Sequence, residues 1–425
     1  MKVSIWGLGS VGLPLALTFT LKGADVIGID VNEEHVENIR NGNTHIYEPF
    51  GNTDTNGVLK EVVGKKFFPT TDYKKAEDAN YHLVTVGIPL DDNMNLIWTP
   101  LESALHNLGK ILKEGDTVVL RATVVPGTTT GLAREILEKE SGLKAGKDFY
   151  LAYAPERIAE GRAYEEFRKM PTLVGGINEK SREKAKEVLS TILESYFVEV
   201  SDPWIAEMSK VLENASRDVY IAVVNEMAKL AIARGLRPLE VIEAANTHPR
   251  VKLLRPGAGV GGHCIPNAFY YLKPLFDDRT GKSLVFASAR QVNDEMPLFL
   301  ASYIDQNAKA LGIDKSNKVA ILGLAMKDFS YDDRYSPALF LKKYLEEKGW
   351  NNIWAYDPMV PKRFDTHIDD IDAVLSDAKV VIITALQEGI TAETVEKYIS
   401  DGMLVLDTKG ILTPVNNKKL KVVVF

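Results

Sequence analysis

The sequence has a single cysteine among 425 residues, and it lacks any long hydrophobic run. One cysteine excludes an internal disulfide framework and suits a reducing compartment. The most apolar helical stretch, residues 220–232, is interrupted by Asn225, Glu226 and Lys229, so it does not qualify as a membrane span. The first residues show no basic and apolar leader. We therefore expect a soluble cytoplasmic protein without a membrane partner.

The sequence also has no excess of basic residues, because it contains 51 lysine and arginine residues and 58 aspartate and glutamate residues. The resulting net charge of −7 argues against non-specific nucleic-acid binding, so no nucleic-acid partner is expected. The seven histidines are scattered, and no cluster of histidine, cysteine and carboxylate residues has the spacing of metal ligands. We therefore predict no metal. The length is sufficient for two or three domains.

Short β-branched runs alternate with helical patterns over residues 1–200, which indicates βαβ units and a mostly parallel sheet. A helical region follows over 201–312, and a second alternation of strands and helices fills 313–425. The predicted fold is therefore α/β, with domain boundaries near residues 200 and 312. The predicted strands are 3–6, 25–30, 82–86, 117–122, 149–153, 196–200, 318–323, 352–356, 380–384, 403–406 and 420–425.

A long helix is predicted to begin at Pro203, because Asp202 is a typical N-cap and proline is favoured at the first helical position. Helical periodicity continues to Gly235, a typical helix stop. About 32 residues at roughly 1.5 Å each give a helix about 48 Å long. Such a helix suits a spine between two domains with spare surface for a dimer contact. This surface is compatible with a homodimer or a higher homo-oligomer.

The first predicted strand runs into a G-x-G-x-x-G pattern at residues 7–12, and the second ends at Asp30. In a Rossmann turn these glycines permit a tight turn, close approach of a pyrophosphate and close packing of helix on strand. An acidic residue at the position of Asp30 binds ribose hydroxyls and favours NAD over NADP. The alternative is a glycine turn beside a surface aspartate. The residues predicted to bind NAD are Gly7, Gly9, Ser10, Val11, Gly12 and Asp30.

Cys264 ends a segment of unusual composition, because four glycines stand within the eight residues from Gly257 to Cys264. Glycine lets a backbone approach a ligand closely. The segment is therefore predicted to wrap around a ligand and deliver one thiol to it. The alternative is a buried cysteine that acts as a small hydrophobic residue beside a tight turn.

These features together resemble the nucleotide-sugar 6-dehydrogenases, the family that acts on UDP-glucose, GDP-mannose and UDP-N-acetylmannosamine. The resemblance covers nearly the whole chain, and segments 155–157, 248–257 and 261–264 are most similar to the UDP-N-acetylhexosamine branch. It implies an N-terminal Rossmann domain for NAD, a central long-helix domain and a C-terminal Rossmann-like domain for the UDP-sugar. It also implies oxidation of the C6 alcohol to a carboxylate with reduction of two NAD, through a cysteine thiohemiacetal and thioester.

The same resemblance assigns roles to residues of this chain. Cys264 matches the nucleophile, and a thiol is the most nucleophilic candidate at neutral pH. Lys210 and Asn214 share one helix face and match the pair that stabilises the oxyanion, although a solvated pair is the alternative. Thr123 matches a threonine that helps place water and also lies at the cofactor. Glu156 matches a glutamate near the thioester, with a plain strand-end turn as the alternative.

Substrate binding is implied for a further set of residues. Lys327 and Arg334 follow the glycine turn of the second α/β domain, and the alternative for both is a surface ion-pair cluster with Asp332 and Asp333. The third glycine is missing there, so this half is not expected to bind a second NAD. The predicted substrate-binding residues are Glu160, Lys210, Arg250, Gly261, Lys327 and Arg334.

The chain departs from the family where members usually carry an aspartate four residues after the cysteine, because Ala268 occupies that position. Asn267 beside it can donate hydrogen bonds but cannot accept a proton, and a lost general base costs about 10²–10⁴ in rate. Three alternatives remain: Glu156 substitutes, Asn267 alone positions the water, or hydrolysis is slow. Ala385–Gln387 and Lys409 also differ from the usual family residues.

Three other functions are compatible with parts of the sequence. UDP-glucose could replace UDP-N-acetylmannosamine as substrate. A two-electron hydroxyacid-type dehydrogenase also joins a Rossmann domain to a long helix, but it needs neither Cys264 nor residues 318–425. A non-catalytic nucleotide-sugar binder would explain the missing aspartate, but not the intact cysteine and glycine pattern.

Overall fold

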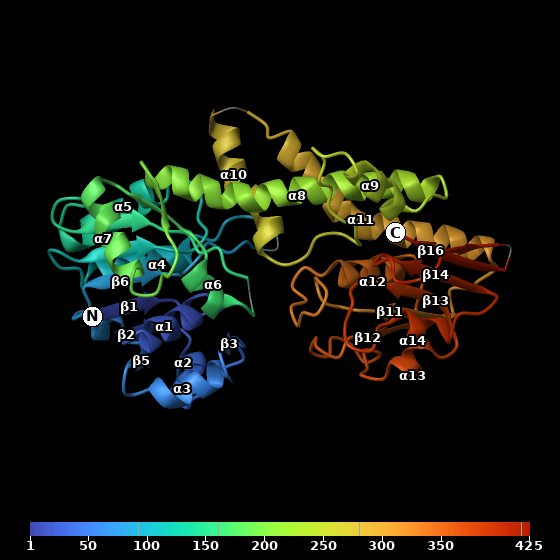
Figure 1. Ribbon diagram of the computed structural model, residues 1–425, viewed down its shortest axis with the longest axis horizontal. Coiled ribbons are helices and arrows are strands. Elements are labelled where there is room, and N and C mark those ends of the chain that lie inside the picture. Colours follow the sequence, from blue (N-terminus) through green and yellow to red (C-terminus); the bar gives the residue numbers. More distant parts are fainter. Residues whose placement is uncertain (92, 160, 280, 418) are drawn as a thin grey trace. The chain divides into compact units, whose positions relative to one another are not determined.

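The computed structural model describes residues 1–91, 93–159, 161–279, 281–417 and 419–425. The chain folds as two compact units, Met1–Leu212 with Tyr270–Leu272, and Glu213–Phe269 with Lys273–Phe425. Each unit contains a mostly parallel sheet with helices packed against it, so the predicted α/β class is confirmed (Figure 1). The predicted domain boundaries near 200 and 312 stay predictions.

The first unit is built on an eight-stranded sheet in the order β10-β9-β8-β7-β6-β1-β2-β5. All neighbouring strands are parallel except β8 and β9. The strands are β1 (Lys2–Trp6), β2 (Asp25–Ile29), β5 (Phe67–Thr70), β6 (Tyr81–Val84), β7 (Thr117–Leu120), β8 (Tyr150–Tyr153), β9 (Thr172–Gly176) and β10 (Phe197–Val200), with a separate hairpin of β3 (Pro49–Phe50) and β4 (Thr53–Asp54).

The helices of the first unit cover this sheet, and α1 is the most deeply buried of them. Nine of the ten residues of α1 are buried, and its leucines and Phe19 pack with Val3 and Ile5 of β1 in one core. The helices are α1 (Gly12–Leu21), α2 (Glu33–Arg40), α3 (Thr55–Val62), α4 (Thr99–Gly109), α5 (Arg134–Ser141), α6 (Ala163–Lys169) and α7 (Glu179–Leu189), with a 3-10 turn η1 (Tyr73–Ala76) and a π-helical turn η2 (Thr129–Ala133).

The strand order of the first unit positions the cofactor loop. β1 lies between β2 and β6. The chain passes from β1 to β2 on one side and later returns to β6 on the other side, so the strand order reverses at β1. Ligands of open parallel sheets bind outside the carboxyl ends of the strands at such a switch point. The G-x-G-x-x-G pattern connects the carboxyl end of β1 to α1 and therefore lies at this position.

The second unit contains a six-stranded sheet in the order β12-β11-β13-β14-β16-β15, parallel except for its last pair. Its strands are β11 (Lys318–Leu322), β12 (Ile353–Tyr356), β13 (Ala378–Ile383), β14 (Met403–Asp407), β15 (Val415–Asn416) and β16 (Leu420–Val424). Its helices are α9 (Pro238–Asn246), α10 (Cys264–Arg279), α11 (Val285–Ala310), α12 (Pro337–Glu347), α13 (Ile371–Leu375) and α14 (Ala392–Glu396).

Both faces of this second sheet are buried under helices. Val319, Ile321 and Ile382 pack in one core with apolar side chains of α11 and α12, whereas Leu322 and Ile383 pack in another with side chains of α13 and α14. Successive strand residues therefore point to opposite helical layers. This explains why the strands read as continuous apolar runs, as parallel sheets buried on both faces do.

The predicted long helix is confirmed as α8 (Pro203–Ala233), in which the boundary between the two units falls. The Asp202 carboxylate accepts a hydrogen bond from the Trp204 amide at 2.8 Å, as an N-cap should, and Gly235 has a φ of +70° just beyond the helix. Within the described part of the chain, no helix is long and apolar enough to cross a membrane.

The helix α8 buries three polar side chains among apolar ones such as Val211, Val224 and Ile232. Glu207, Asp218 and Asn225 are buried, and at about 100° per residue they lie within roughly 20° of one another around the helix. The opposite side exposes a row of large apolar side chains to solvent. These are Ile205, Met208, Leu212, Tyr220, Val223, Met227 and Leu230.

Candidate active site

The G-x-G-x-x-G loop is held in shape by hydrogen bonds at the carboxyl end of β1. The Thr85 hydroxyl donates to the carbonyls of Trp6 and Gly7, both at 2.8 Å. A Cβ atom at Gly12 would lie 1.8 Å from the Gly7 carbonyl oxygen, so only glycine fits there. A Cβ atom at Gly9 would meet no atom within 4 Å. The loop therefore presents open backbone at the start of α1, where Ser10 and Val11 also lie.

Asp30 follows β2 directly and supports the same loop. Its carboxylate accepts hydrogen bonds from the Leu8 amide at 2.8 Å and the Asn32 amide at 3.0 Å, and the residue is partly exposed. An acceptor at this point can take ribose hydroxyl donors, so these residues fit the adenosine side of a dinucleotide.

Arg121 and Glu156 form a buried ion pair at the ends of the neighbouring strands β7 and β8. Their side chains are only 4% and 10% exposed. One carboxylate oxygen accepts from the Arg121 guanidinium, and the other accepts from the Arg157 amide at 2.7 Å and the Ile158 amide at 3.2 Å. Both oxygens of Glu156 thus accept hydrogen bonds from the protein, which hold the carboxylate in place. Thr123 lies in the loop after β7, partly exposed.

Glu207 anchors α8 to the loop that follows Thr123. Its carboxylate accepts hydrogen bonds from the Gly127 amide, from the Thr129 amide at 2.8 Å and from the Thr129 hydroxyl at 2.6 Å. Burial raises the pKa of Glu207 to about 7, although these three hydrogen bonds act to lower it. The neighbouring Thr128 hydroxyl donates to the Val125 carbonyl at 2.6 Å, so this loop is also held by a hydrogen bond of its own.

Lys210 lies one turn beyond Glu207 on α8 and is partly exposed. Asn214 follows one further turn along the same helix. Among the described residues, neither side chain has a hydrogen-bond or ion-pair partner. Glu160, a predicted substrate residue, lies outside the described residues.

The glycine segment of the second unit delivers Cys264 to the first position of α10, where the thiol is exposed. The alternative of a buried, purely hydrophobic cysteine is therefore wrong. The Gly262 amide donates to the Arg334 carbonyl at 2.7 Å, and the His263 ring lies 5.2 Å from that of Tyr335. The loop is thus joined to the segment that follows β11.

The helix that begins with Cys264 also carries the position of the missing aspartate. Ala268 is 1% exposed and Asn267 is 6% exposed. A carboxylate at position 268 would therefore be buried, so the alanine matches its apolar surroundings. Arg250 lies in the turn after α9 and is exposed.

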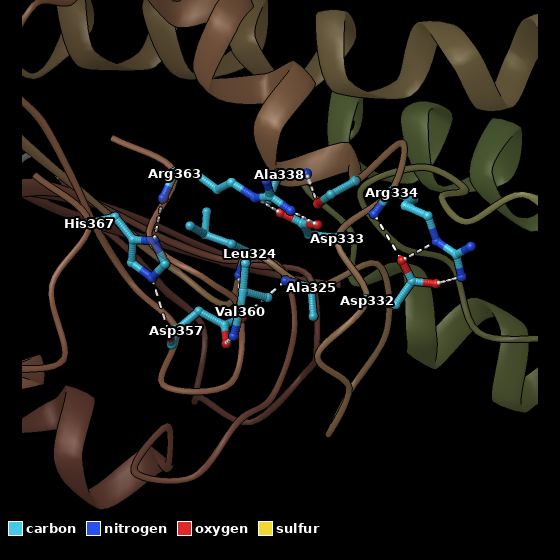
Figure 2. A network of polar contacts seen from close by, with 11 residues as sticks. Leu324, Ala325, Asp332, Asp333, Arg334, Ala338, Asp357, Val360, Arg363 and His367 are labelled. Carbon is cyan, nitrogen blue, oxygen red and sulfur yellow. Dashed lines mark hydrogen bonds and ion pairs between the residues drawn. The ribbon is translucent and has the colours of Figure 1, made fainter. Parts of the chain in front are cut away.

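The loop after β11 resembles the NAD loop but is closed by its own side chains (Figure 2). One oxygen of Asp357 accepts from the Leu324 amide at 2.7 Å, the Ala325 amide at 2.9 Å and the Gln387 amide group at 3.1 Å. Its other oxygen accepts from the amides of Met359 and Val360 at 3.0 and 3.1 Å. Asp357 is fully buried, so no acceptor remains for a ribose.

Two ion pairs follow in the same segment (Figure 2). Arg334 donates to Asp332 at 2.6 and 2.8 Å, and Arg363 pairs with Asp333. Burial acts to raise the pKa of Asp332, but the hydrogen bonds from Arg334 hold it below its usual value. The alternative of a surface ion-pair cluster therefore accounts for some of the contacts of Arg334, namely those with Asp332. Lys327 has no such partner among the residues described.

The predicted site residues fall into two sets, one in each unit. Thr123, Glu156 and Lys210 belong to the first, with the NAD loop, whereas Cys264 and the remaining described residues belong to the second. Sequence reasoning missed the anchoring role of Glu207, the Arg121 partner of Glu156 and the buried Asp357. In the described ranges no group of histidine, cysteine and carboxylate side chains could hold a metal ion.

The fold and these loops define a class of protein: an NAD-dependent dehydrogenase in which a Rossmann domain is followed along the chain by helices and a second, modified Rossmann-like domain. The chain belongs to the UDP-glucose/GDP-mannose dehydrogenase family. Residues 1–193 match its NAD binding domain, 204–295 its central domain and 320–414 its UDP binding domain. It is therefore an NAD-dependent nucleotide-sugar dehydrogenase, and the hydroxyacid-type alternative is wrong.

Relatives and solved structures agree with this family. The chain is 36% identical to a UDP-N-acetyl-D-mannosamine dehydrogenase from Pyrococcus horikoshii, over 90% of this chain and 88% of the relative. A structure of UDP-D-ManNAc dehydrogenase from the same organism matches with a TM-score of 0.85 at 32% identity, over 96% of this chain and 98% of the other. A UDP-glucose dehydrogenase from Pyrobaculum islandicum matches with a TM-score of 0.84 at 26% identity, over 100% and 97%.

Proposed function

We propose that this enzyme oxidises UDP-N-acetyl-D-mannosamine at C6 to the uronate, with Cys264 as the covalent nucleophile. The observation that carries the proposal is the exposed thiol of the only cysteine, held at the first turn of α10 by a glycine segment. The choice of sugar is supported by the relatives named for that substrate.

The proposed reaction has two oxidations and one hydrolysis. The loop of residues 7–12 would hold NAD, which would supply the hydride acceptor for each oxidation. The first oxidation converts the alcohol to an aldehyde, and the Cys264 sulfur adds to its carbonyl carbon to form a thiohemiacetal. The second removes the carbon-bound hydrogen of that adduct and leaves a thioester. Water then adds to the thioester and releases the carboxylate and the thiol.

The surrounding residues are proposed to act through hydrogen bonds. Lys210 and Asn214 stabilise the oxyanions of the thiohemiacetal and of thioester hydrolysis. Thr123 places water near the cofactor. Because Arg121 and two amides occupy both oxygens of Glu156, we propose that Glu156 fixes its loop. Asn267 then positions the hydrolytic water, and hydrolysis is slow.

The nucleotide sugar is proposed to bind along the second unit. Lys327 offers an ammonium group for the diphosphate, and Arg334 offers donors next to its pair with Asp332. Glu160, Arg250 and Gly261 complete the proposed substrate contacts. The domain boundaries near 200 and 312 belong to this proposal as well.

We also propose that the enzyme is a homodimer formed through α8. The exposed apolar row of this helix supports this, because a large apolar row on a helix is normally covered. The cytoplasm is the proposed location, because a catalytic thiol must stay reduced.

The test is the amount of NADH formed per nucleotide sugar, with UDP-N-acetylmannosamine and UDP-glucose each limiting. Two NADH per UDP-N-acetylmannosamine would support the proposal, whereas two per UDP-glucose alone would reassign the substrate. Cys264→Ser should abolish complete oxidation, and a variant that still forms two NADH would overturn the covalent route. If neither sugar yields NADH, the substrate is another nucleotide sugar.

A further inference from the structure

A group of polar side chains is buried between α8 and α11 in the second unit. Asp218 and Asn225 come from α8, and Arg290 and Asn293 come from α11. They are 3%, 0%, 2% and 1% exposed, respectively. Burying polar side chains is costly unless they are hydrogen-bonded, so their arrangement calls for a role.

In this group, Asp218 accepts hydrogen bonds from both residues of α11. The Arg290 guanidinium donates to the Asp218 carboxylate at 2.8 Å. The Asn293 amide nitrogen donates to the same carboxylate at 2.7 Å and to the Asp218 carbonyl at 2.9 Å. Because the backbone carbonyl of Asp218 can only accept, Asn293 must turn its nitrogen toward Asp218 and its oxygen away.

The orientation of Asn293 fixes that of Asn225. The Asn225 amide nitrogen donates to the Asn293 oxygen at 2.9 Å, so the Asn225 oxygen faces the glycine segment. There it accepts a hydrogen bond from the Gly257 amide at 3.0 Å. Asp218 thus fixes the orientation of Asn293, and Asn293 fixes that of Asn225. As a result, the side-chain oxygen of Asn225 accepts from the Gly257 amide.

The glycine segment is held at both of its ends. Gly257 is bound by Asn225, and the Gly262 amide donates to the Arg334 carbonyl at 2.7 Å, two residues before Cys264. Between them, a Cβ atom at Gly259 would approach the Asn293 carbonyl oxygen to 3.2 Å, so the segment packs directly on α11.

We infer that Asn225 is a positioning residue for Cys264, oriented by Asn293 and Asp218. The inference rests on the proposed function, in which Cys264 must meet the C6 carbon. Only a side chain that donates to Asn293 and accepts from Gly257 satisfies both neighbours. Alanine at position 225 satisfies neither, and leaves the Gly257 amide without its acceptor.

The experiment compares Asn225→Ala with Asn307→Ala by hydrogen exchange and steady-state kinetics on the full-length enzyme. Asn307 is a matched control on α11, because its side chain accepts from Lys421 at 2.6 Å and donates to the Tyr303 carbonyl at 2.7 Å. In Asn225→Ala we expect exchange in the peptide spanning residues 256–263 to accelerate about tenfold. We also expect kcat to fall about tenfold, with KM for NAD within about twofold of wild type.

The conservative variant Asn225→Asp keeps an oxygen for the Gly257 amide but sets a second oxygen against that of Asn293. Its exchange rate and kcat should lie between those of wild type and Asn225→Ala. If Asn225→Ala does not fold, Asn225→Asp provides the same two readouts. Wild-type exchange together with wild-type kcat in the folded variant would overturn the inference, as would equal effects in Asn307→Ala.

Alkylation of the single cysteine with iodoacetamide separates this inference from the proposed function. If alkylated wild-type enzyme still forms two NADH per sugar, Cys264 is not the nucleophile and the proposed function fails. The exchange rate of residues 256–263 in Asn225→Ala would still report whether Asn225 holds the segment. If alkylation abolishes NADH formation but Asn225→Ala leaves exchange and kcat unchanged, only the positioning role fails.

Discussion

Glu207 is the buried carboxyl group whose titration should be measurable in the stability of the fold. Its pKa is raised from 4.5 to about 7, because burial disfavours its charge. Below pH 4.5 it is protonated in both the folded and the unfolded chain. As the pH rises toward 7, the unfolded chain loses this proton first, so the unfolding free energy falls by up to about 3 kcal/mol.

Glu207→Gln should remove this dependence. The difference in unfolding free energy between wild type and Glu207→Gln should change by up to about 3 kcal/mol between pH 4.5 and 8, in the direction that disfavours wild type at high pH. Urea unfolding at several pH values measures it. Glu226→Gln changes an exposed glutamate of the same helix and should track wild type. Parallel curves for wild type and Glu207→Gln would contradict the raised pKa.

At the scale of single residues, the sequence predicted which residues bind the cofactor and carry the thiol, but not which residues contact one another. The glycine pattern, Asp30 and the cysteine segment are local signals, because each depends on residue types at short spacing. The pairing of Arg121 with Glu156 spans 35 residues, and that of Gly127 with Glu207 spans 80. Such contacts depend on which strands and helices become neighbours, and no local pattern encodes that.

At the scale of elements, the two glycine loops have the same construction with different outcomes. Gly7 and Gly323 have φ values of +92° and +87°, and Thr384 donates to the carbonyls of Leu322 and Gly323 as Thr85 does in the first unit. Asp357 then takes the place of Asp30. Five donors of the protein saturate Asp357, whereas Asp30 has two backbone donors and is partly exposed.

Substitutions of these two aspartates should therefore separate binding from stability. Asp30→Asn should raise KM for NAD about tenfold, because the amide is a poorer acceptor for ribose hydroxyls. Asp357→Asn should leave KM for NAD unchanged but reduce the unfolding free energy by about 1–3 kcal/mol, because an amide nitrogen would face backbone donors. NAD titrations and urea unfolding of both variants measure this. A KM effect of Asp357→Asn as large as that of Asp30→Asn would refute the distinction.

The sequence did not predict strands that contain residues with low strand propensity. β5 contains Pro69, and it is tolerated because β5 lies at the edge of its sheet. β9 ends in two glycines, Gly175 and Gly176, which weaken any strand pattern. The strands predicted from the sequence have β-branched and aliphatic runs, and this holds for the buried β1 and also for the edge strand β10, which is not buried.

At the scale of the whole molecule, the decisive feature is the row of exposed apolar side chains on α8, which lies opposite the side that buries Glu207, Asp218 and Asn225 among apolar residues. Periodicity alone showed a helix but not which side faces the protein, because both sides contain regularly spaced residues. The buried side carries Glu207, Asp218 and Asn225. Glu207 forms its hydrogen bonds within the first unit, and Asp218 and Asn225 form theirs within the second. The exposed apolar side then has no function in a monomer, and self-association through it would remove it from water.

A single charge on this side should dissociate the assembly. Met227 is 40% exposed on α8, and Met227→Asp would place a carboxylate in an apolar contact, which is costly to desolvate. Sedimentation of wild type should show a dimer or larger species, and Met227→Asp should shift it toward the monomer. Met359→Asp is the matched control, because Met359 is 44% exposed in the loop after β12 and should leave the assembly intact. A monomeric wild type, or dissociation by both substitutions alike, would mean that the apolar side of α8 has another partner.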